Sequence, residues 1–135
     1  MGLVQDTNFP SRLRRVDVIG VPITATNMDD FLKLIDEELD AMRGEYVCVS
    51  NAHACVMAHD DPAYWVCQAE SIASIPDGKP LSVVGRKEVP TMGRVTGPDL
   101  MREIFAMSAE RGWTHYFYGN EQKTFCSLQS CNNLR

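Results

Sequence analysis

A chain of 135 residues with 44% hydrophobic and 23% charged side chains has the composition of one ordinary globular domain, and not of a disordered or fibrous protein. Its formal net charge of -5 at pH 7 argues against a nucleic acid partner, because binding of a phosphate backbone needs a basic face. No apolar run approaches the ~18 residues of a membrane-spanning helix, so we expect a cytoplasmic protein.

The five cysteines form an odd set without a C-x-x-C pair, which is typical of reduced thiols. Cys55 and His59 lie four residues apart on an expected helix and could share a metal ion. Two ligands do not make a zinc site, so the sequence favours packing over a metal site here. No G-x-G-x-x-G or Walker pattern is present, and we expect no cofactor.

The first elements follow an N-terminal leader over residues 1–14. The β-branched run at 15–24 contains a Gly-x-Pro, which predicts a bent strand or two short strands. The segment from Thr26 to Gly44 has apolar residues at helical spacing, and Thr26 or Asn27 can cap it. We expect an amphipathic helix there.

The middle of the chain predicts two further strands around a broken helix. Residues 45–50 are a short β-rich run, and residues 52–70 have a helical pattern that Pro62 divides into two. Residues 71–75 predict a third strand, which ends at Pro76.

The last part of the chain continues this alternation. We expect a short helix at 78–87, a loop at 88–95, a capped helix at 96–112 and a fourth strand at 114–120, followed by a less regular tail at 121–135. Strands that alternate with amphipathic helices predict an α/β fold with a largely parallel sheet.

Polar segments follow three of the expected strands, at 50–53, 77–78 and 119–120. In an open α/β sheet, ligands bind beyond the carboxyl ends of the strands, where helix N-termini point inward. These segments are therefore the candidate binding edge.

Asp77 and Gly78 allow two interpretations. An Asp-Gly pair after a proline is a common turn, and the pattern alone favours that structural role. A carboxylate at the mouth of a sheet can also act as a general base when partial burial raises its pKa. Gly78 would then let a substrate approach the backbone closely.

The residues around Asn51 also have structural and functional interpretations. Asn51 is a good N-cap, and its amide could also orient a hydroxyl or phosphate oxygen. His53 offers a second acid or base, although a polar surface role is more common. Ser50 has no visible base and orienting group, which argues against a serine nucleophile.

Arg94 precedes the expected helix N-terminus at Gly97. An arginine together with free backbone N–H groups suits a diphosphate, but a lone arginine more often pairs with a surface acid. Spacing alone therefore indicates an α/β domain with a sugar or nucleotide site, and it leaves the reaction open.

The order of these segments resembles one known family. The PDG-x-PL motif at 76–81 and the R-x-x-G-x-D-L motif at 94–100 occur at the separation seen in the amino-terminal half of the WecG/TagA/CpsF glycosyltransferase family, glycosyltransferase family 26. The likeness covers about residues 16–120. It implies a Rossmann-like α/β fold, with helices on both faces of a largely parallel sheet.

The resemblance implies an inverting transferase of cell-surface polysaccharide synthesis. Such enzymes move an N-acetylmannosamine-type or related sugar from a UDP-sugar to a polyprenyl-diphosphate-linked sugar. Asp77 falls on the family's proposed base, which takes the acceptor hydroxyl proton, and one direct displacement needs no enzyme nucleophile. The expected substrate-binding residues are Asn51, Ser50, Gly78, Arg94 and Gly97.

The chain departs from the family pattern at two places. Val49 stands where members often carry threonine, with Ser50 one place later. The tail at 121–135 does not follow the family, so we expect a truncated copy whose fold is incomplete. One hypothesis is a cytoplasmic transferase working at the inner face of the plasma membrane, alone or as a homo-oligomer. The alternative is a non-catalytic remnant or a nucleotide-sugar-binding domain.

Overall fold

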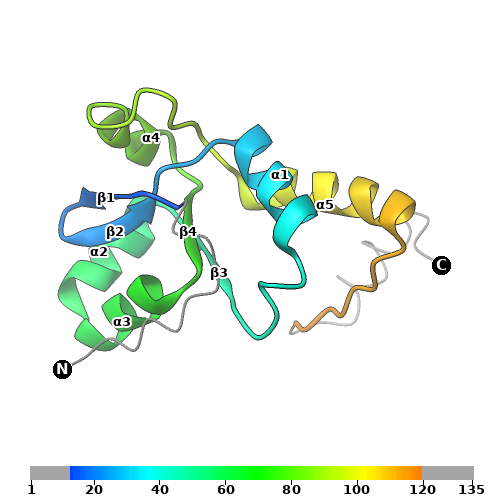
Figure 1. Ribbon diagram of the computed structural model, residues 1–135. Helices are drawn as coiled ribbons and strands as arrows, with labels where there is room; N and C mark the ends of the chain where they lie inside the picture. Colours follow the sequence, from blue (N-terminus) through cyan, green and yellow to red (C-terminus); the bar gives the residue numbers. More distant parts are fainter. Residues whose placement is uncertain (1–12, 120–135) are drawn as a thin grey trace. The chain divides into compact units, whose positions relative to one another are not determined.

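The computed structural model describes residues 13–119 of the chain (Figure 1). The chain divides into two compact units, Met1–Leu100 and Met101–Arg135, and each is described by itself. The expected leader at 1–14 lies almost wholly outside the described residues, and the tail at 121–135 lies wholly outside them.

The described part of the first unit, residues 13–100, contains four short strands and four helices, and a fifth helix begins at its end. In chain order the elements are β1 (Arg15–Val18), β2 (Val21–Thr24), α1 (Met28–Glu38), β3 (Val47–Ser50), α2 (Ala52–Asp60), α3 (Pro62–Glu70), β4 (Ala73–Pro76), α4 (Lys79–Gly85) and α5 (Gly97–Arg111). Strands and helices therefore occur close to where the sequence predicts them, up to α5, except that α1 ends at Glu38 and not at the expected Gly44, because residues 39–44 form turns.

The β-branched run forms an antiparallel hairpin of β1 and β2, which confirms two short strands in place of one. The turn falls at Ile19 and Gly20, both with positive φ, 51° and 83°. A left-handed turn of this kind matches the twist of the paired strands. The Asp17 carboxylate accepts a hydrogen bond from the Gly20 N–H at 3.0 Å and closes the turn.

Strands β3 and β4 form a parallel pair, joined by the crossover through α2 and α3. In the register of this pair Ser50 lies opposite Pro76. The Ser74 N–H donates to the Thr24 hydroxyl at 2.8 Å, which ties β4 to the end of β2. The carboxyl ends of β3 and β4 therefore lie at the same edge.

Helices cover the strands from two sides. Figure 1 shows α2 and α3 on one side of β1 and β2 and α4 on the other, and contacts of α3 with β2 and of α4 with β1 agree with this view. The buried cluster between these elements consists of Val16, Val18, Val21, Ile23, Cys55, Ala58, Leu81 and Met92. Burial of these apolar side chains positions the strand ends that carry the polar residues.

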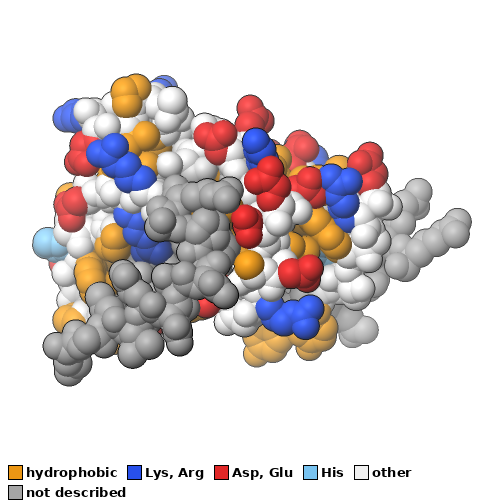
Figure 2. Space-filling view, in the orientation of Figure 1, with side chains coloured by type: hydrophobic (Ala, Val, Ile, Leu, Met, Phe, Trp, Pro, Cys, Tyr) orange, Lys and Arg blue, Asp and Glu red, His pale blue; other side chains and the backbone are white. Residues whose placement is uncertain are grey.

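Side-chain caps explain where three helices begin. The side chains of Asn27, Asn51 and Asp61 accept hydrogen bonds from N–H groups in the first turns of α1, α2 and α3. Acidic side chains gather over α1 in Figure 2, where Asp29 and Asp30 occupy the first turn and complement the positive end of the helix dipole. Pro62 at the start of α3 divides the helical segment, as expected.

The second unit contains most of α5 and the segment that follows it. The Phe105 ring makes edge contacts with the rings of His115 and Phe117, at centroid distances of 4.9 and 5.6 Å. Tyr116 and Tyr118, which alternate with them, are 90% and 94% exposed. The extended segment therefore buries one face against α5.

Within the described residues one expectation of the sequence is wrong and another is not confirmed. Residues 114–119 form no strand, so the predicted fourth strand at 114–120 is wrong for the part that the structure describes. The described strands form two two-stranded sheets, and only β3 and β4 are parallel. A largely parallel, Rossmann-like sheet is therefore not confirmed. A strand needs a neighbouring strand for its backbone hydrogen bonds. Residues 114–119 instead contact the Phe105 ring through the rings of His115 and Phe117.

Candidate active site

The polar edge lies where β3 and β4 end. Asn51 and Asp77 each follow the last residue of a paired strand, Ser50 and Pro76. The Asp77 N–H donates to the Ser50 carbonyl at 2.8 Å, which extends the parallel ladder by one bond. Asp77, the expected base, and Asn51, the expected substrate-binding asparagine, therefore lie on neighbouring strand ends.

The Asp77 side chain is partly buried. Its backbone carbonyl accepts a hydrogen bond from the Arg94 Nε at 3.1 Å. Within residues 13–119 its carboxylate has no hydrogen-bond or ion-pair partner. A partly buried carboxylate without a partner can take a proton from a ligand, whereas a carboxylate that caps or pairs is already occupied.

Arg94 reaches the site from the loop between α4 and α5. The Val95 N–H donates to the Pro76 carbonyl at 2.9 Å, so this loop runs along the end of β4. The Arg94 side chain is exposed, and only its Nε has a hydrogen-bond partner within the described part of the chain. The remaining guanidinium N–H groups are available to an anion.

Gly78 occupies the N-cap position of α4 with φ -111° and ψ 140°, which any residue can adopt. A Cβ built there would lie 3.5 Å from the nearest atoms, on Leu81 and Pro80, and 3.7 Å from the Asn51 Cα. These are ordinary contacts. Neither backbone strain nor packing within the described chain requires glycine at this position, so the simple turn interpretation does not account for it.

Asn51 is exposed, and its Oδ1 accepts a hydrogen bond from the Ala54 N–H at 2.9 Å. Its structural role as N-cap is therefore confirmed. The amide NH₂ group has no partner among the residues described, so the same side chain can cap α2 and donate to a ligand. His53 is exposed in the first turn of α2.

Ser50 lies inside the protein and not at the edge. Its side chain is fully buried, and its Oγ lies 2.6 Å from the Gln68 Oε1 and 2.7 Å from the Ser74 Oγ. The hydroxyl therefore contacts other protein groups. Sequence reasoning missed Gln68 and Ser74, although a polar residue on an otherwise apolar strand is a signal that could have indicated such a cluster.

Gly97 begins α5 close to β3. A Cβ there would lie 3.3 Å from the Val49 Cγ1, which is a tight contact. Packing of the helix start against the strand therefore explains this glycine without a ligand. Val49 itself, at the place of the family's threonine, is 45% exposed.

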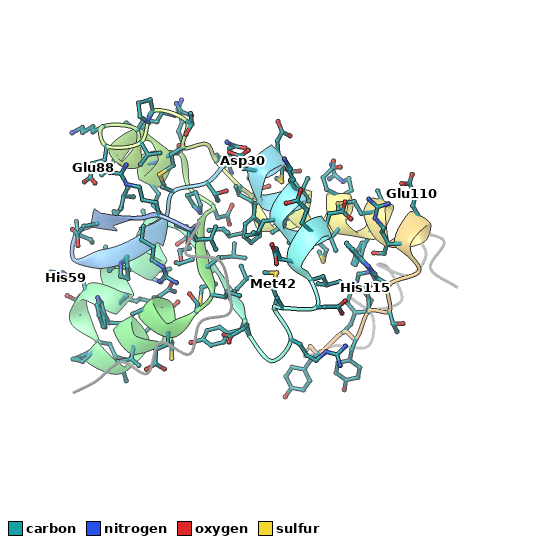
Figure 3. All side chains as sticks on the ribbon, viewed as in Figure 1. Asp30, Met42, His59, Glu88, Glu110 and His115 are labelled. Carbon is teal, nitrogen blue, oxygen red and sulfur yellow. The ribbon has the colours of Figure 1, made fainter. Side chains whose placement is uncertain are left out.

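Metal ligands do not cluster in the described residues, where no group of three or more His, Cys, Asp or Glu side chains could hold an ion. Cys55 is buried, and burial raises the pKa of its thiol. His59, labelled in Figure 3, contacts the Ile19 carbonyl through Nδ1 at 2.9 Å. None of the described helices is long and apolar enough to span a membrane.

The fold and the strand-end site are those of an α/β protein, and a family comparison identifies its class as glycosyltransferase-like. The matching family is described as the glycosyl transferase WecG/TagA/CpsF family, and the match covers residues 16–133. The chain belongs to this family, which confirms the resemblance seen in the motifs. The match continues past residue 120, up to which the resemblance was expected to run. None of the curated proteins compared with the chain matches it.

Proposed function

We propose that this chain acts in inverting glycosyl transfer, with Asp77 as the general base. Family membership supplies the class of reaction. The observation that carries the assignment is the partly buried Asp77 carboxylate at the end of β4, which has no partner within residues 13–119. Among Asp77, Asn51, Ser50 and Arg94, it is the one side chain with a carboxylate that can accept a proton.

The proposed reaction is one displacement. The Asp77 carboxylate takes the proton of an acceptor hydroxyl as that oxygen forms a bond to the anomeric carbon of the donor sugar. The bond from that carbon to the diphosphate oxygen breaks, and the nucleoside diphosphate leaves with the electron pair. The configuration inverts, so a single base is sufficient.

The neighbouring residues would hold the two substrates. The free N–H groups of the Arg94 guanidinium suit the oxygens of a diphosphate, which carries the charge that develops on the leaving group. The Asn51 amide would donate to a sugar or phosphate oxygen, and Gly78 would leave room for a substrate against the backbone. Ser50 would act from the interior, and Gly97 through the close packing of the first residue of α5 on Val49 of β3.

We propose a UDP-sugar of the N-acetylmannosamine type as donor and a polyprenyl-diphosphate-linked sugar as acceptor. The reaction would take place on the cytoplasmic side of the membrane that carries the lipid, as a step of surface polysaccharide synthesis. The family and the diphosphate-compatible arginine support this proposal.

The test is release of UDP from UDP-N-acetylmannosamine in the presence of a polyprenyl-diphosphate-linked N-acetylglucosamine, with Asp77→Asn compared with the original chain. Because a general base contributes about 10²- to 10⁴-fold, we expect the Asp77→Asn variant to lose activity by that factor. Binding of UDP, measured by calorimetry, should be retained.

The matched control is Asp60→Asn, which neutralises an exposed carboxylate at the end of α2. This variant should keep its activity. Equal activity of Asp77→Asn and the original chain would remove Asp77 as the base. UDP binding without any UDP release in the original chain would identify a nucleotide-sugar-binding protein instead of an enzyme.

A further inference from the structure

We propose that Gln68, which lies outside the site, is a positioning residue that holds the ends of β3 and β4 at the separation that Asn51 and Asp77 need. This inference rests on the proposed function, because it concerns the geometry of the same site. Gln68 lies on α3 and is only 3% exposed. A buried amide side chain normally has a specific hydrogen-bonding role.

One amide oxygen connects both parallel strands. The Gln68 Oε1 accepts hydrogen bonds from the Ser50 Oγ at 2.6 Å and the Ser74 Oγ at 2.7 Å, and the two hydroxyl oxygens lie 2.7 Å apart. The two distances to Oε1 are typical of O–H···O bonds and support an oxygen at this position of the amide. The three side chains, which we call the Gln68 triad, are all buried.

The Gln68 triad is connected to the site through the backbone. Ser50 directly precedes Asn51, and its carbonyl accepts the Asp77 N–H at 2.8 Å. Ser74 lies on β4, three residues before Asp77. A shift of β3 relative to β4 therefore changes the position of the base relative to Asn51.

The helix that carries Gln68 is itself fixed at its end. The Arg15 guanidinium donates to the carbonyls of Gln68 and Ala69 at 3.2 and 3.1 Å, and also to the carbonyl of Ser71. Arg15 is part of β1. The last turn of α3 is thereby held to β1. The backbone of Gln68 is therefore fixed in place, and its side chain can hold β3 and β4 relative to this helix.

Apolar substitution of the whole Gln68 triad should affect the positions of the strand ends more than the stability of the fold. Replacing all partners of a buried hydrogen-bond cluster by apolar groups of similar shape can be nearly neutral for stability. Apolar contacts lack direction and prefer carbon–carbon distances of ~3.5–4.0 Å, so they would not hold the strand ends within the ~0.5 Å that catalytic groups need. Because a misplacement of ~1 Å can cost ~10²-fold in rate, we expect a large loss of kcat.

The experiment compares Gln68→Met, the triple variant Ser50→Ala, Ser74→Ala, Gln68→Met, and the control Ser82→Ala. Ser82 is also buried, but its hydroxyl donates within α4, to the Lys79 carbonyl at 2.9 Å. We expect Gln68→Met to lower the melting temperature, because it removes the oxygen that accepts hydrogen bonds from two buried hydroxyls. The triple variant should recover most of that stability, while its kcat for UDP release stays at least about tenfold reduced and its KM changes little.

A second measurement does not depend on activity. Hydrogen exchange of the Asp77 amide, which donates to the Ser50 carbonyl, should be faster in the triple variant than in the original chain. Exchange of the Phe31 amide, which donates to the Asn27 carbonyl in α1, should be unchanged. If the triple variant does not fold, Ser74→Ala alone is measured in the same two ways.

The outcomes separate this inference from the proposed function. Unchanged Asp77 exchange, or faster exchange with full kcat, would overturn the positioning role. Recovery of kcat together with stability in the triple variant would reduce Gln68 to a structural residue. Faster Asp77 exchange in a chain whose original form releases no UDP would refute the proposed function and support the role of the Gln68 triad in holding the strand ends.

Discussion

Two neighbouring residues of the strand ends, Ser50 and Asp77, have opposite environments. Ser50 is fully buried and its hydroxyl is held by Gln68 and Ser74. The Asp77 carboxylate has no partner in the described part of the chain, and beside it Arg94 keeps N–H groups free. A site that binds an anion and removes a proton needs free N–H donors for the anion and a free carboxylate for the proton.

Replacement of Arg94 by alanine should weaken UDP binding. The variant removes the guanidinium that we propose for the diphosphate, and the loss of about one charge-assisted hydrogen bond at an exposed site corresponds to about a tenfold rise in Kd. Calorimetry with UDP measures the Kd of both chains. The difference in Kd between the variant and the original chain should be smaller at high salt, because added ions screen the attraction between Arg94 and the diphosphate.

Arg86→Ala is the matched control for this prediction. Arg86 is exposed, and its Nε donates to the Met92 carbonyl at 2.8 Å, as the Arg94 Nε does to the Asp77 carbonyl. Equal weakening of UDP binding by both variants would show that net charge, and not the position of Arg94, is responsible.

At the scale of elements, the site depends on the parallel pair of β3 and β4 and on the helices packed against the strands. Helix α4, which starts directly after Gly78, packs against β1 and β4. Gly85 at its end lies so close to the core that a Cβ would stand 2.0 Å from the Met92 Sδ and 3.3 Å from the Val16 Cγ2. Glycine here is a packing requirement, in contrast to Gly78.

Gly85→Ala should therefore destabilise the fold. Met92 is buried and must move to admit the methyl group, and overpacking of this kind costs about 1–3 kcal/mol. Urea denaturation followed by circular dichroism measures the free energy of unfolding. Val83→Ala, on an exposed position of the same helix, should change it by less than about 0.5 kcal/mol. A Gly85→Ala variant as stable as the original would contradict this packing.

At the scale of the whole molecule, the first compact unit contains the buried cluster and the strand ends, and the second contains the ring contacts of Phe105. Cys55 lies in the buried cluster of the first unit, whereas Cys67 is exposed on α3. The reactivities of these two thiols therefore compare a buried and an exposed position of the same unit.

Alkylation with iodoacetamide at pH 8 should modify Cys67 quickly and Cys55 slowly. Burial blocks access to Cys55 and raises the pKa of its thiol, so that less thiolate is present at this pH. Mass spectrometry of peptides follows each cysteine separately. Urea near the unfolding midpoint should make the two rates similar, and a fast reaction of Cys55 in native buffer would be inconsistent with the buried cluster.

Much of the local structure could be predicted from the sequence. The caps at Asn27 and Asn51, the helix break at Pro62 and the short hairpin strands occur where expected. These features depend on residues a few positions apart. The motif at 76–81 also indicated the family, and a match over residues 16–133 confirms it.

What the sequence by itself determined is the order of the elements as far as α5, the starts of the helices and the family, because caps, breakers and motifs act over short stretches of chain. The tertiary structure decided that Ser50 faces the interior, that Gln68 connects two strands and that residues 114–119 pack by their rings instead of pairing. Such outcomes depend on partners far apart in the chain, as in the contact from Arg15 to Ala69 across 54 residues. Burial and strand pairing are properties of the assembled fold, and no local pattern specifies them.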